Sequence, residues 1–129
     1  MSSQIRENLQ RFFVLGISYK KTAIEIRERF SLQENDQSRL LHKAKEQGID
    51  SLIVLSTCNR TEIYSHTQDT DLIKQLFVEV CGVTPKDLEQ NSYELRGHDS
   101  INHLFRVSSG LDSQTVSYTH LTLPTTPYV

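Results

Sequence analysis

Short apolar runs and longer stretches with helical spacing alternate along the chain. Residues 11–19 (RFFVLGISY) and 51–56 (SLIVLS) are rich in β-branched and aromatic side chains and have the length of strands. Residues 60–66 follow a break at 57–59 and alternate between polar and apolar positions, which indicates a further strand. Residues 92–96 predict a short edge strand. The pattern therefore contains four strands, the second and third of which are neighbours in the sequence.

The first predicted helix lies between the first two strands. Ser31 and Glu34 have the spacing of a capping box, in which two side chains accept hydrogen bonds from each other's backbone N–H groups. Gly48 supplies a stop, so the helix is predicted from about 32 to 47. Apolar residues follow the start at helical spacing: Leu40, Leu41 and Ala44.

A second helix is expected to begin at Asp69, or at the residue after it, and to end at Gly82. Thr84 and Pro85 then open a short helical turn, with Asp87 at the reciprocal capping position. One face of the second helix is apolar: Leu72, Ile73, Leu76, Phe77 and Val80.

The last predicted helix is capped by Asp99 and has Ile101, Leu104, Phe105 and Ser108 on one face. The first six elements follow the order strand, helix, two strands, helix, strand. This order matches a split β-α-β β-α-β, ferredoxin-like plan. The predicted fold class is therefore α+β, a ferredoxin-like domain followed by a helix. A length of 129 residues favours one domain.

Residues 115–129 (TVSYTHLTLPTTPYV) differ from the rest of the chain. They carry no charge, contain five threonines and two prolines, and show no periodicity. Residues 116–121 (VSYTHL) also correspond to one reading frame of a common transposon-derived sequencing adapter, GTC TCT TAT ACA CAT CT. A natural threonine-rich tail is the alternative. We expect residues 1–114 to form the domain, incomplete at its C-terminal end, and 115–129 to be an unstructured tail from an adapter or cloning scar.

Composition narrows the class of protein. Hydrophobic residues make up 36% and charged residues 23%, which is typical of a soluble globular domain with one modest core. The sequence contains no apolar run of membrane-spanning length and no hydrophobic signal region at its start. These features predict a cytoplasmic domain that does not enter a membrane. The two cysteines, Cys58 and Cys81, are expected to be free thiols.

Cys58 is the most informative candidate for chemistry. It follows a buried strand, and its neighbours Thr57, Asn59 and Arg60 are polar, whereas Cys81 lies within the apolar pattern of a helix. A thiol beside a guanidinium and the amides of a turn can have a lowered pKa and act as a nucleophile. Position alone slightly favours the alternative, an inert cysteine at the end of a strand.

Three sequence blocks resemble one family, the glutamyl-tRNA reductases. Residues 56–64 (STCNRTEIY) resemble the family's nucleophile motif, and 16–29 (GISYKKTAIEIRER) resemble its opening strand and the segment after it. Residues 103–113 (HLFRVSSGLDS) resemble the helix that carries the active-site histidine. The blocks stand in the family's order across residues 12–113.

The chain also departs from the family pattern. Tyr19 stands where many members have histidine. After Ser113 the family continues with a segment that completes the substrate pocket, then a nicotinamide-binding domain and a helical dimerisation domain. The printed sequence contains none of these and no G-x-G-x-x-G motif. We therefore expect an N-terminal catalytic domain without the part that binds NADPH.

The resemblance implies a reaction. The cysteine thiolate attacks the ester of glutamyl-tRNA(Glu), a thioester forms, and NADPH reduces it to glutamate-1-semialdehyde. This is the first committed step of C5-pathway tetrapyrrole (porphyrin, haem) biosynthesis, and the full-length enzyme is expected to be a homodimer. The fragment itself is expected to be at most a slow esterase. With neither a CxxC motif nor histidines at ligand spacing, no metal site is expected.

The resemblance also implies roles for single residues. Cys58 is the nucleophile, and Arg60 binds the γ-carboxylate of the substrate, although a surface ion pair with Glu62 is the ordinary alternative. His103 polarises the carbonyl or protonates the leaving oxygen. Further substrate contacts are implied for Thr57, Asn59 and Ser113.

Two other functions remain open. One is a non-catalytic module that binds tRNA or a protein through a mildly basic N-terminal face, since residues 1–30 carry six Lys/Arg against three Asp/Glu. That face would comprise Arg11, Lys20, Lys21, Arg27 and Arg29. The other is a thiol hydrolase that acts on esters without a cofactor.

Overall fold

The structure, a computed structural model, describes residues 3–17, 23–49, 51–57, 60–111 and 118–121. The helices are α1 (Ser3–Gln10), α2 (Ile24–Arg29), α3 (Glu34–Glu46), α4 (Thr70–Cys81), α5 (Pro85–Asn91) and α6 (His98–Leu111). The strands are β1 (Phe12–Ile17), β2 (Leu52–Ser56), β3 (Thr61–His66), β4 (Ser92–Arg96) and β5 (Tyr118–Leu121). Of these, α1, α2 and β5 were not predicted.

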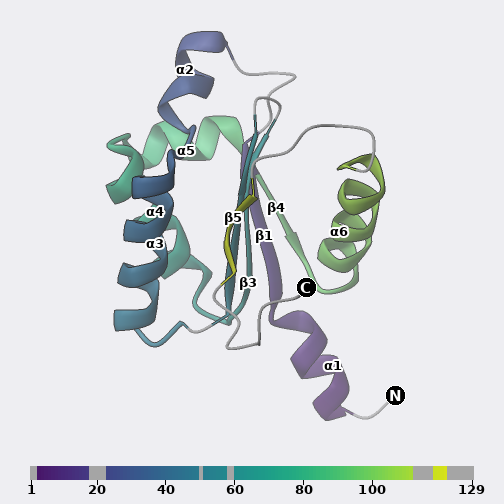
Figure 1. Cartoon of the computed structure of the whole chain (residues 1–129). Helices are drawn as coiled ribbons and strands as arrows, with labels where there is room; N and C mark the ends of the chain where they lie inside the picture. Colours follow the sequence, from purple (N-terminus) through teal and green to yellow (C-terminus); the bar gives the residue numbers. More distant parts are fainter. Residues whose placement is uncertain (1–2, 18–22, 50, 58–59, 112–117, 122–129) are drawn as a thin grey trace.

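The strands form one antiparallel sheet in the order β4-β1-β3-β2-β5. The order of the first four, β4-β1-β3-β2, is that of a split β-α-β β-α-β domain, so the predicted fold class is confirmed. Helices α3, α4 and α5 cover one face of the sheet, and α6 lies on the other (Figure 1). Each face of the sheet therefore has its own set of inward-pointing side chains.

The main core lies between the sheet and the helix pair α3–α4. Alternate residues of the strands point to that side, and the hydrophobic positions predicted for α4 meet them. Phe77 of α4 packs against Phe30, with ring centroids 5.7 Å apart. The principal members from the strands and from the two helices are Phe13, Leu15, Ile17, Leu52, Val54, Ile63, Leu40, Ala44, Ile73, Leu76, Phe77 and Val80.

The predicted capping box at the start of α3 is wrong. The N-cap is Gln33, which makes no side-chain capping bond, and the helix begins at Glu34. Leu32 is held in the core instead, where its N–H donates to Ser56 Oγ and its carbonyl accepts from Gln37 Nε2. The segment before α3 is thus held by a buried hydrogen bond to β2, and not by the local cap that the sequence pattern predicted.

The predicted ends of α4 and α5 are confirmed. Asp69 caps α4 by accepting a hydrogen bond from the N–H of Leu72. Gly82 ends α4 in the left-handed region at φ +70°, a conformation that glycine adopts without the steric penalty of a Cβ. Thr84 and Asp87 form the full reciprocal capping box of α5.

One expectation for α6 is wrong. The helix begins at His98, so Asp99 lies within its first turn and is not its cap. Phe105 and Ser108 are exposed, whereas Ser100, His103 and Val107 lie toward the sheet. This side of the helix faces inward because His103 contacts the Glu62 carboxylate of the sheet.

The tail was expected to be unstructured, which is wrong for β5. Tyr118–Leu121 pairs with β2, opposite Leu55 and Ile53, with a register shift between these two partners. An uncovered β2 edge would present unpaired backbone groups, and any extended segment that reaches it can satisfy them. Residues 112–117 and 122–129 lie outside the described part of the chain.

The predicted basic face is not formed by the described arginines. Arg11 precedes β1, whereas Arg27 and Arg29 belong to α2, beyond the other end of that strand (Figure 1). A six-residue strand separates its ends by roughly 17–20 Å. Lys20 and Lys21 lie outside the described residues. No helix in the described ranges combines the length and the apolar character needed to cross a membrane.

Replacing Phe77 with alanine should lower the free energy of unfolding by about 3–5 kcal/mol, because the ring is 1% exposed and leaves a cavity beside Phe30. Phe105→Ala is the matched control, since that ring is 68% exposed and should contribute little. Chemical denaturation of both variants gives the comparison. Equal losses would contradict the placement of the two aromatic rings.

Candidate functional site

The hairpin between β2 and β3 carries the predicted nucleophile motif. The backbone N–H of Thr57 donates to the carbonyl of Arg60 at 2.8 Å, and the N–H of Arg60 donates to Thr57 Oγ1 at 3.2 Å. These bonds close the hairpin on both sides of Cys58 and Asn59, which lie outside the described residues. Thr57 therefore has a turn-closing role in the structure, as its ordinary turn chemistry predicts.

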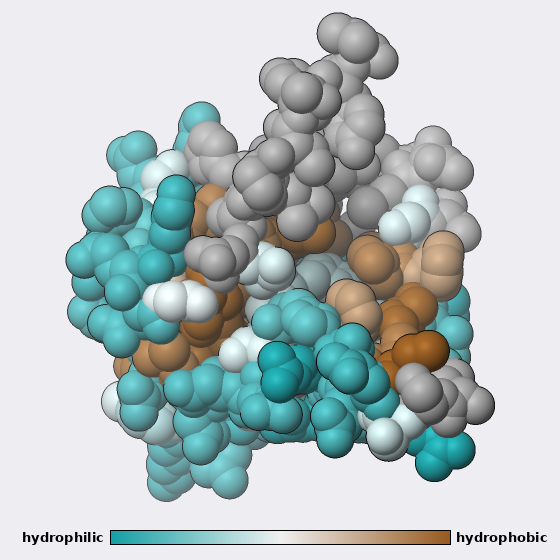
Figure 2. All heavy atoms as spheres, turned by 90° about the horizontal axis from the view of Figure 1, so that it is seen from below, coloured by the Kyte–Doolittle hydropathy of each residue, from teal (hydrophilic) through white to brown (hydrophobic). Residues whose placement is uncertain are grey.

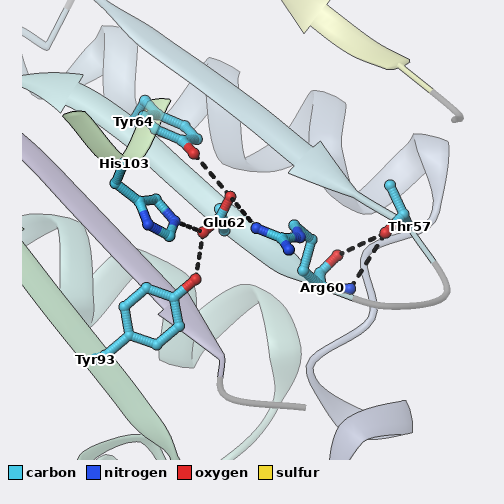
Figure 3. A network of polar contacts seen from close by, with 6 residues as sticks. All are labelled: Thr57, Arg60, Glu62, Tyr64, Tyr93 and His103. Carbon is cyan, nitrogen blue, oxygen red and sulfur yellow. Dashed lines mark hydrogen bonds and ion pairs between the residues drawn. The ribbon is translucent and has the colours of Figure 1, made fainter. Parts of the chain in front are cut away.

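A buried carboxylate, that of Glu62, lies on the second face of the sheet near the start of β3. The side chain of Glu62 is fully buried, and four side chains converge on it from β3, β4, α6 and the turn before β3 (Figure 3). Tyr64 Oη donates to Oε1 at 2.7 Å, and Tyr93 Oη donates to Oε2. His103 Nε2 contacts Oε2, and Arg60 NH1 lies 3.7 Å from Oε1.

The contacts to Glu62 account for its acceptor capacity. A carboxylate has two oxygens with about two lone-pair positions each. Tyr64 and Arg60 face one oxygen, and Tyr93 and His103 face the other. An unpaired carboxylate would be strongly disfavoured at this depth, so these neighbours are what permits the charge to be buried.

Gly16 makes the contact between Tyr93 and Glu62 possible. In the sheet Gly16 of β1 lies opposite Glu62 of β3 on one side and opposite Tyr93 of β4 on the other. The Tyr93 ring passes over Gly16, and a Cβ built there would overlap the ring carbons and the hydroxyl. Any side chain at position 16 would therefore block the path by which Tyr93 reaches the carboxylate.

Two tyrosine rings enclose His103. The Tyr64 ring stacks on the imidazole with centroids 6.5 Å apart, and the Tyr93 ring meets it edge-on at 5.6 Å. The His103 side chain is 18% exposed. The imidazole is thus fixed in its plane by the rings and in its rotation by Glu62, while part of it remains open to solvent.

Burial raises the pKa values of both tyrosines well above the ordinary value of 10.0, and the Glu62 carboxylate raises them further. Tyr64 and Tyr93 are therefore hydroxyl donors at any ordinary pH. Burial also raises the pKa of the Cys81 thiol to about 12, with a further contribution from Asp36. Cys81 is a free thiol that stays protonated, as expected for a structural cysteine.

Arg60 connects the buried carboxylate with the surface. Its side chain is 36% exposed, and its separation of 3.7 Å from Glu62 is an ion pair beyond hydrogen-bond length. The Arg60–Glu62 pair foreseen as an ordinary surface contact does form, but its acidic member is in the interior. A guanidinium has five N–H donors, so this pairing leaves donors for another carboxylate.

An apolar cavity of about 450 Å³ lies beside this cluster, between α6 and the sheet. Its lining includes Phe12, Val14, Ile101 and Leu104, together with Tyr64, which also belongs to the polar cluster. Figure 2 shows the molecule from below, where hydrophobic side chains (brown) form patches with hydrophilic side chains (teal) around and between them. The cavity offers few polar groups to a charged amino acid, whereas the cluster around Glu62 offers several.

The structure brings together two predicted site residues, Arg60 and His103, through a residue whose role was missed. Glu62 was considered only as a surface partner, and Tyr64 and Tyr93 were not considered. Strand alternation gave a usable signal, because it places Glu62 and Tyr64 on the same face of β3. Cys58, Asn59 and Ser113 lie outside the described residues, so their predicted roles stay predictions.

The described residues do not fit a metal or a dinucleotide site. They contain no group of three or more His, Cys, Asp or Glu side chains that could hold a metal ion. A nicotinamide dinucleotide needs a glycine-rich turn between a parallel strand and a helix, whereas the strands described here pair antiparallel.

Comparison with known proteins agrees with the fold. A family model described as "Glutamyl-tRNAGlu reductase, N-terminal domain" matches residues 15–121. A glutamyl-tRNA reductase from Christiangramia forsetii is 45% identical over 105 residues, covering 81% of this chain and 25% of that protein. One from Heliobacterium mobile is 39% identical over 114 residues, covering 84% of this chain and 26% of its own.

The solved glutamyl-tRNA reductase from Methanopyrus kandleri superposes with a TM-score of 0.56 at 25% identity, covering 83% of this chain and 24% of that one. The sheet and the motif residues thus define an α+β domain of a family of oxidoreductases. The chain belongs to the glutamyl-tRNA reductase family and matches its N-terminal domain. It spans about a quarter of the length of the relatives it matches.

Two of the five tyrosines, Tyr64 and Tyr93, should fail to ionise in the folded protein near pH 10. Their pKa values are raised in the folded state, so the unfolded chain loses these protons first as the pH rises. Stability from this source is complete below pH 10 and falls above it. Phenolate absorbance and circular dichroism, followed together against pH, should show these two phenols ionising only as the protein unfolds. Complete phenolate formation before any unfolding would refute the assignment.

Proposed function

We propose that this chain carries the acyl-transfer step of a glutamyl-tRNA reductase, in which glutamate passes from tRNA(Glu) to Cys58 as a thioester. The observation that supports it most directly is the cluster on Glu62, which gathers Arg60 and His103 beside the hairpin of the nucleophile motif. A cationic fork and an imidazole are the groups that an ester of glutamate requires: one for its free carboxylate and one for its reacting oxygen.

The thiolate of Cys58 attacks the ester carbonyl of glutamyl-tRNA. A sulfur–carbon bond forms, the ester carbon–oxygen bond breaks, and the terminal ribose oxygen of the tRNA leaves with a proton. A thiolate suits this step because it attacks readily and later leaves readily, which divides one difficult reaction into two. Thr57 closes the hairpin, and Asn59 and Ser113 are proposed as further polar contacts of the substrate.

Arg60 is proposed to bind the γ-carboxylate of the glutamyl group. Its side chain reaches the surface, and it approaches Glu62 through Nη1. A planar guanidinium can grip a carboxylate through two parallel N–H bonds, which distinguishes glutamate from its uncharged amide. His103 is proposed to polarise the ester carbonyl or to protonate the leaving ribose oxygen.

NADPH, bound in the full-length enzyme, would supply the hydride that reduces the thioester to glutamate-1-semialdehyde, a precursor of tetrapyrroles. The residues described here have no site for it. Of this chain by itself we therefore propose only transfer of glutamate to Cys58, followed by slow hydrolysis. The complete enzyme is proposed to act as a homodimer in the cytoplasm.

Cys58→Ser should abolish the covalent glutamyl-protein that forms from labelled glutamyl-tRNA. Trapping at low pH preserves a thioester, and labelled protein is then counted. Cys81→Ser is the matched control, because burial keeps that thiol protonated and its loss should leave the label unchanged. Label retained in the Cys58 variant would remove the proposed nucleophile.

Arg60→Lys should weaken discrimination between glutamyl-tRNA and glutaminyl-tRNA by about 2 kcal/mol, or roughly thirtyfold. Lysine keeps the positive charge but lacks the planar fork that grips a carboxylate with two bonds. Arg39→Lys is a control on the outer face of α3, where Arg39 pairs with Asp36 and is largely exposed. The ratio of transfer rates for the two tRNAs gives the result. Unchanged discrimination would mean that Arg60 does not read the γ-carboxylate.

A further inference from the structure

Two side chains face each oxygen of Glu62, yet the acyl-transfer step has no direct use for a buried carboxylate. Its side chain is 0% exposed, so it cannot meet the substrate's carboxylate or its ester. It lies between the two residues that are proposed to do so, Arg60 and His103. Its contribution to the reaction must therefore pass through them.

We propose that Glu62 is a positioning residue that fixes the tautomer of His103 and the orientation of Arg60. This inference rests on the proposed function and extends it to residues that touch no substrate. A carboxylate offers acceptors only, so the nitrogen that faces it, Nε2, is the one that carries a proton. Nδ1 is then the nitrogen through which His103 exchanges protons with the reacting groups.

On this proposal the proton in the transfer step has one route. With Nε2–H bonded to Glu62, Nδ1 would take the proton of the Cys58 thiol and so generate the thiolate that attacks. The imidazolium so formed is stabilised by the adjacent carboxylate. Nδ1 then returns the same proton to the ribose oxygen of the tRNA as the ester bond breaks. Protons and charge balance over the step without any further reactant.

Tyr64 and Tyr93 hold the carboxylate rather than the substrate. Their hydroxyls bind separate oxygens of Glu62, and their rings enclose the imidazole on two sides. Because their pKa values are raised, they remain neutral donors and do not compete for the role of base. The titratable groups that face Glu62 are Tyr64 of β3, Tyr93 of β4, His103 of α6 and Arg60 of the turn before β3, while β1 contributes Gly16.

The direct test of the tautomer is a two-bond proton–nitrogen correlation spectrum of the histidine-labelled chain, recorded where the imidazole is neutral. His103→Gln assigns the resonance among the five histidines. The expected form is Nε2–H, with a mixture of tautomers in Glu62→Gln, because an amide offers a donor as well as an acceptor. A dominant Nδ1–H form in the unaltered chain would overturn the inference. This reading does not depend on glutamyl-tRNA.

The kinetic test is single-turnover transfer of labelled glutamate to Cys58. Glu62→Gln should slow the step roughly tenfold to a hundredfold at saturating glutamyl-tRNA. Glu94→Gln is the matched control: this carboxylate of β4 pairs with Lys74 at 2.9 Å, is 39% exposed, and should leave the rate unchanged. A folded Glu62→Gln protein that transfers glutamate at the unaltered rate would overturn the inference and leave the proposed function intact.

Tyr93→Phe keeps the test decisive if Glu62→Gln does not fold. It removes one hydroxyl and leaves the carboxylate charged, so the rate at saturation should fall while the half-saturating concentration of glutamyl-tRNA stays the same. A merely structural hydroxyl would lower thermal stability without that split, and such a result would count against positioning. If the unaltered chain takes up no glutamate, the proposed function fails, and the tautomer spectrum alone decides the present inference.

Discussion

A negative charge without access to water, on the central strand β3, is the constraint around which this domain is arranged. Glu62 is tolerated only because β3, β4 and α6 each deliver hydrogen-bond donors or positive charge to it. The carboxylate explains why the side of α6 that carries His103 faces the sheet, while the more hydrophobic Phe105 is exposed. On the other face of the sheet, apolar packing holds α3 and α4 in place. On this face, hydrogen bonds and ion pairs to Glu62 hold α6.

The antiparallel strand order lets distant parts of the chain meet at the carboxylate. Tyr93 is 31 residues from Glu62 and His103 is 41 residues away, yet both reach the same oxygen. The order β4-β1-β3 brings β4 within one strand of Glu62, and the connection from β4 leads directly into α6. The cluster is consequently complete only when β1, β3, β4 and α6 are in place.

Local signals predicted much of this fold. Strands β1 to β4, the ends of α4 and the capping box at Thr84 depend on residues near each other in sequence, and each was found. The errors at Ser31 and Asp99 arose where a tertiary contact overrode a plausible local cap. For the site, motif resemblance pointed to Arg60 and His103, which the structure joins through Glu62. Burial of Glu62 could not be derived from β3 alone, because the strands and the helix that enclose it come from elsewhere in the chain.

Gly16 shows how a residue without a side chain can belong to a site. It binds nothing and would be counted as an ordinary strand residue by composition, yet the space above it is filled by Tyr93. An alanine there would be acceptable to an isolated strand and would still separate the tyrosine from the carboxylate. The side chain that this position can accept is therefore limited by the shape of Tyr93, two strands from the charge. A mutational scan that scored activity alone would group Gly16 with the reactive residues, although Gly16 contributes only the room that the Tyr93 ring occupies.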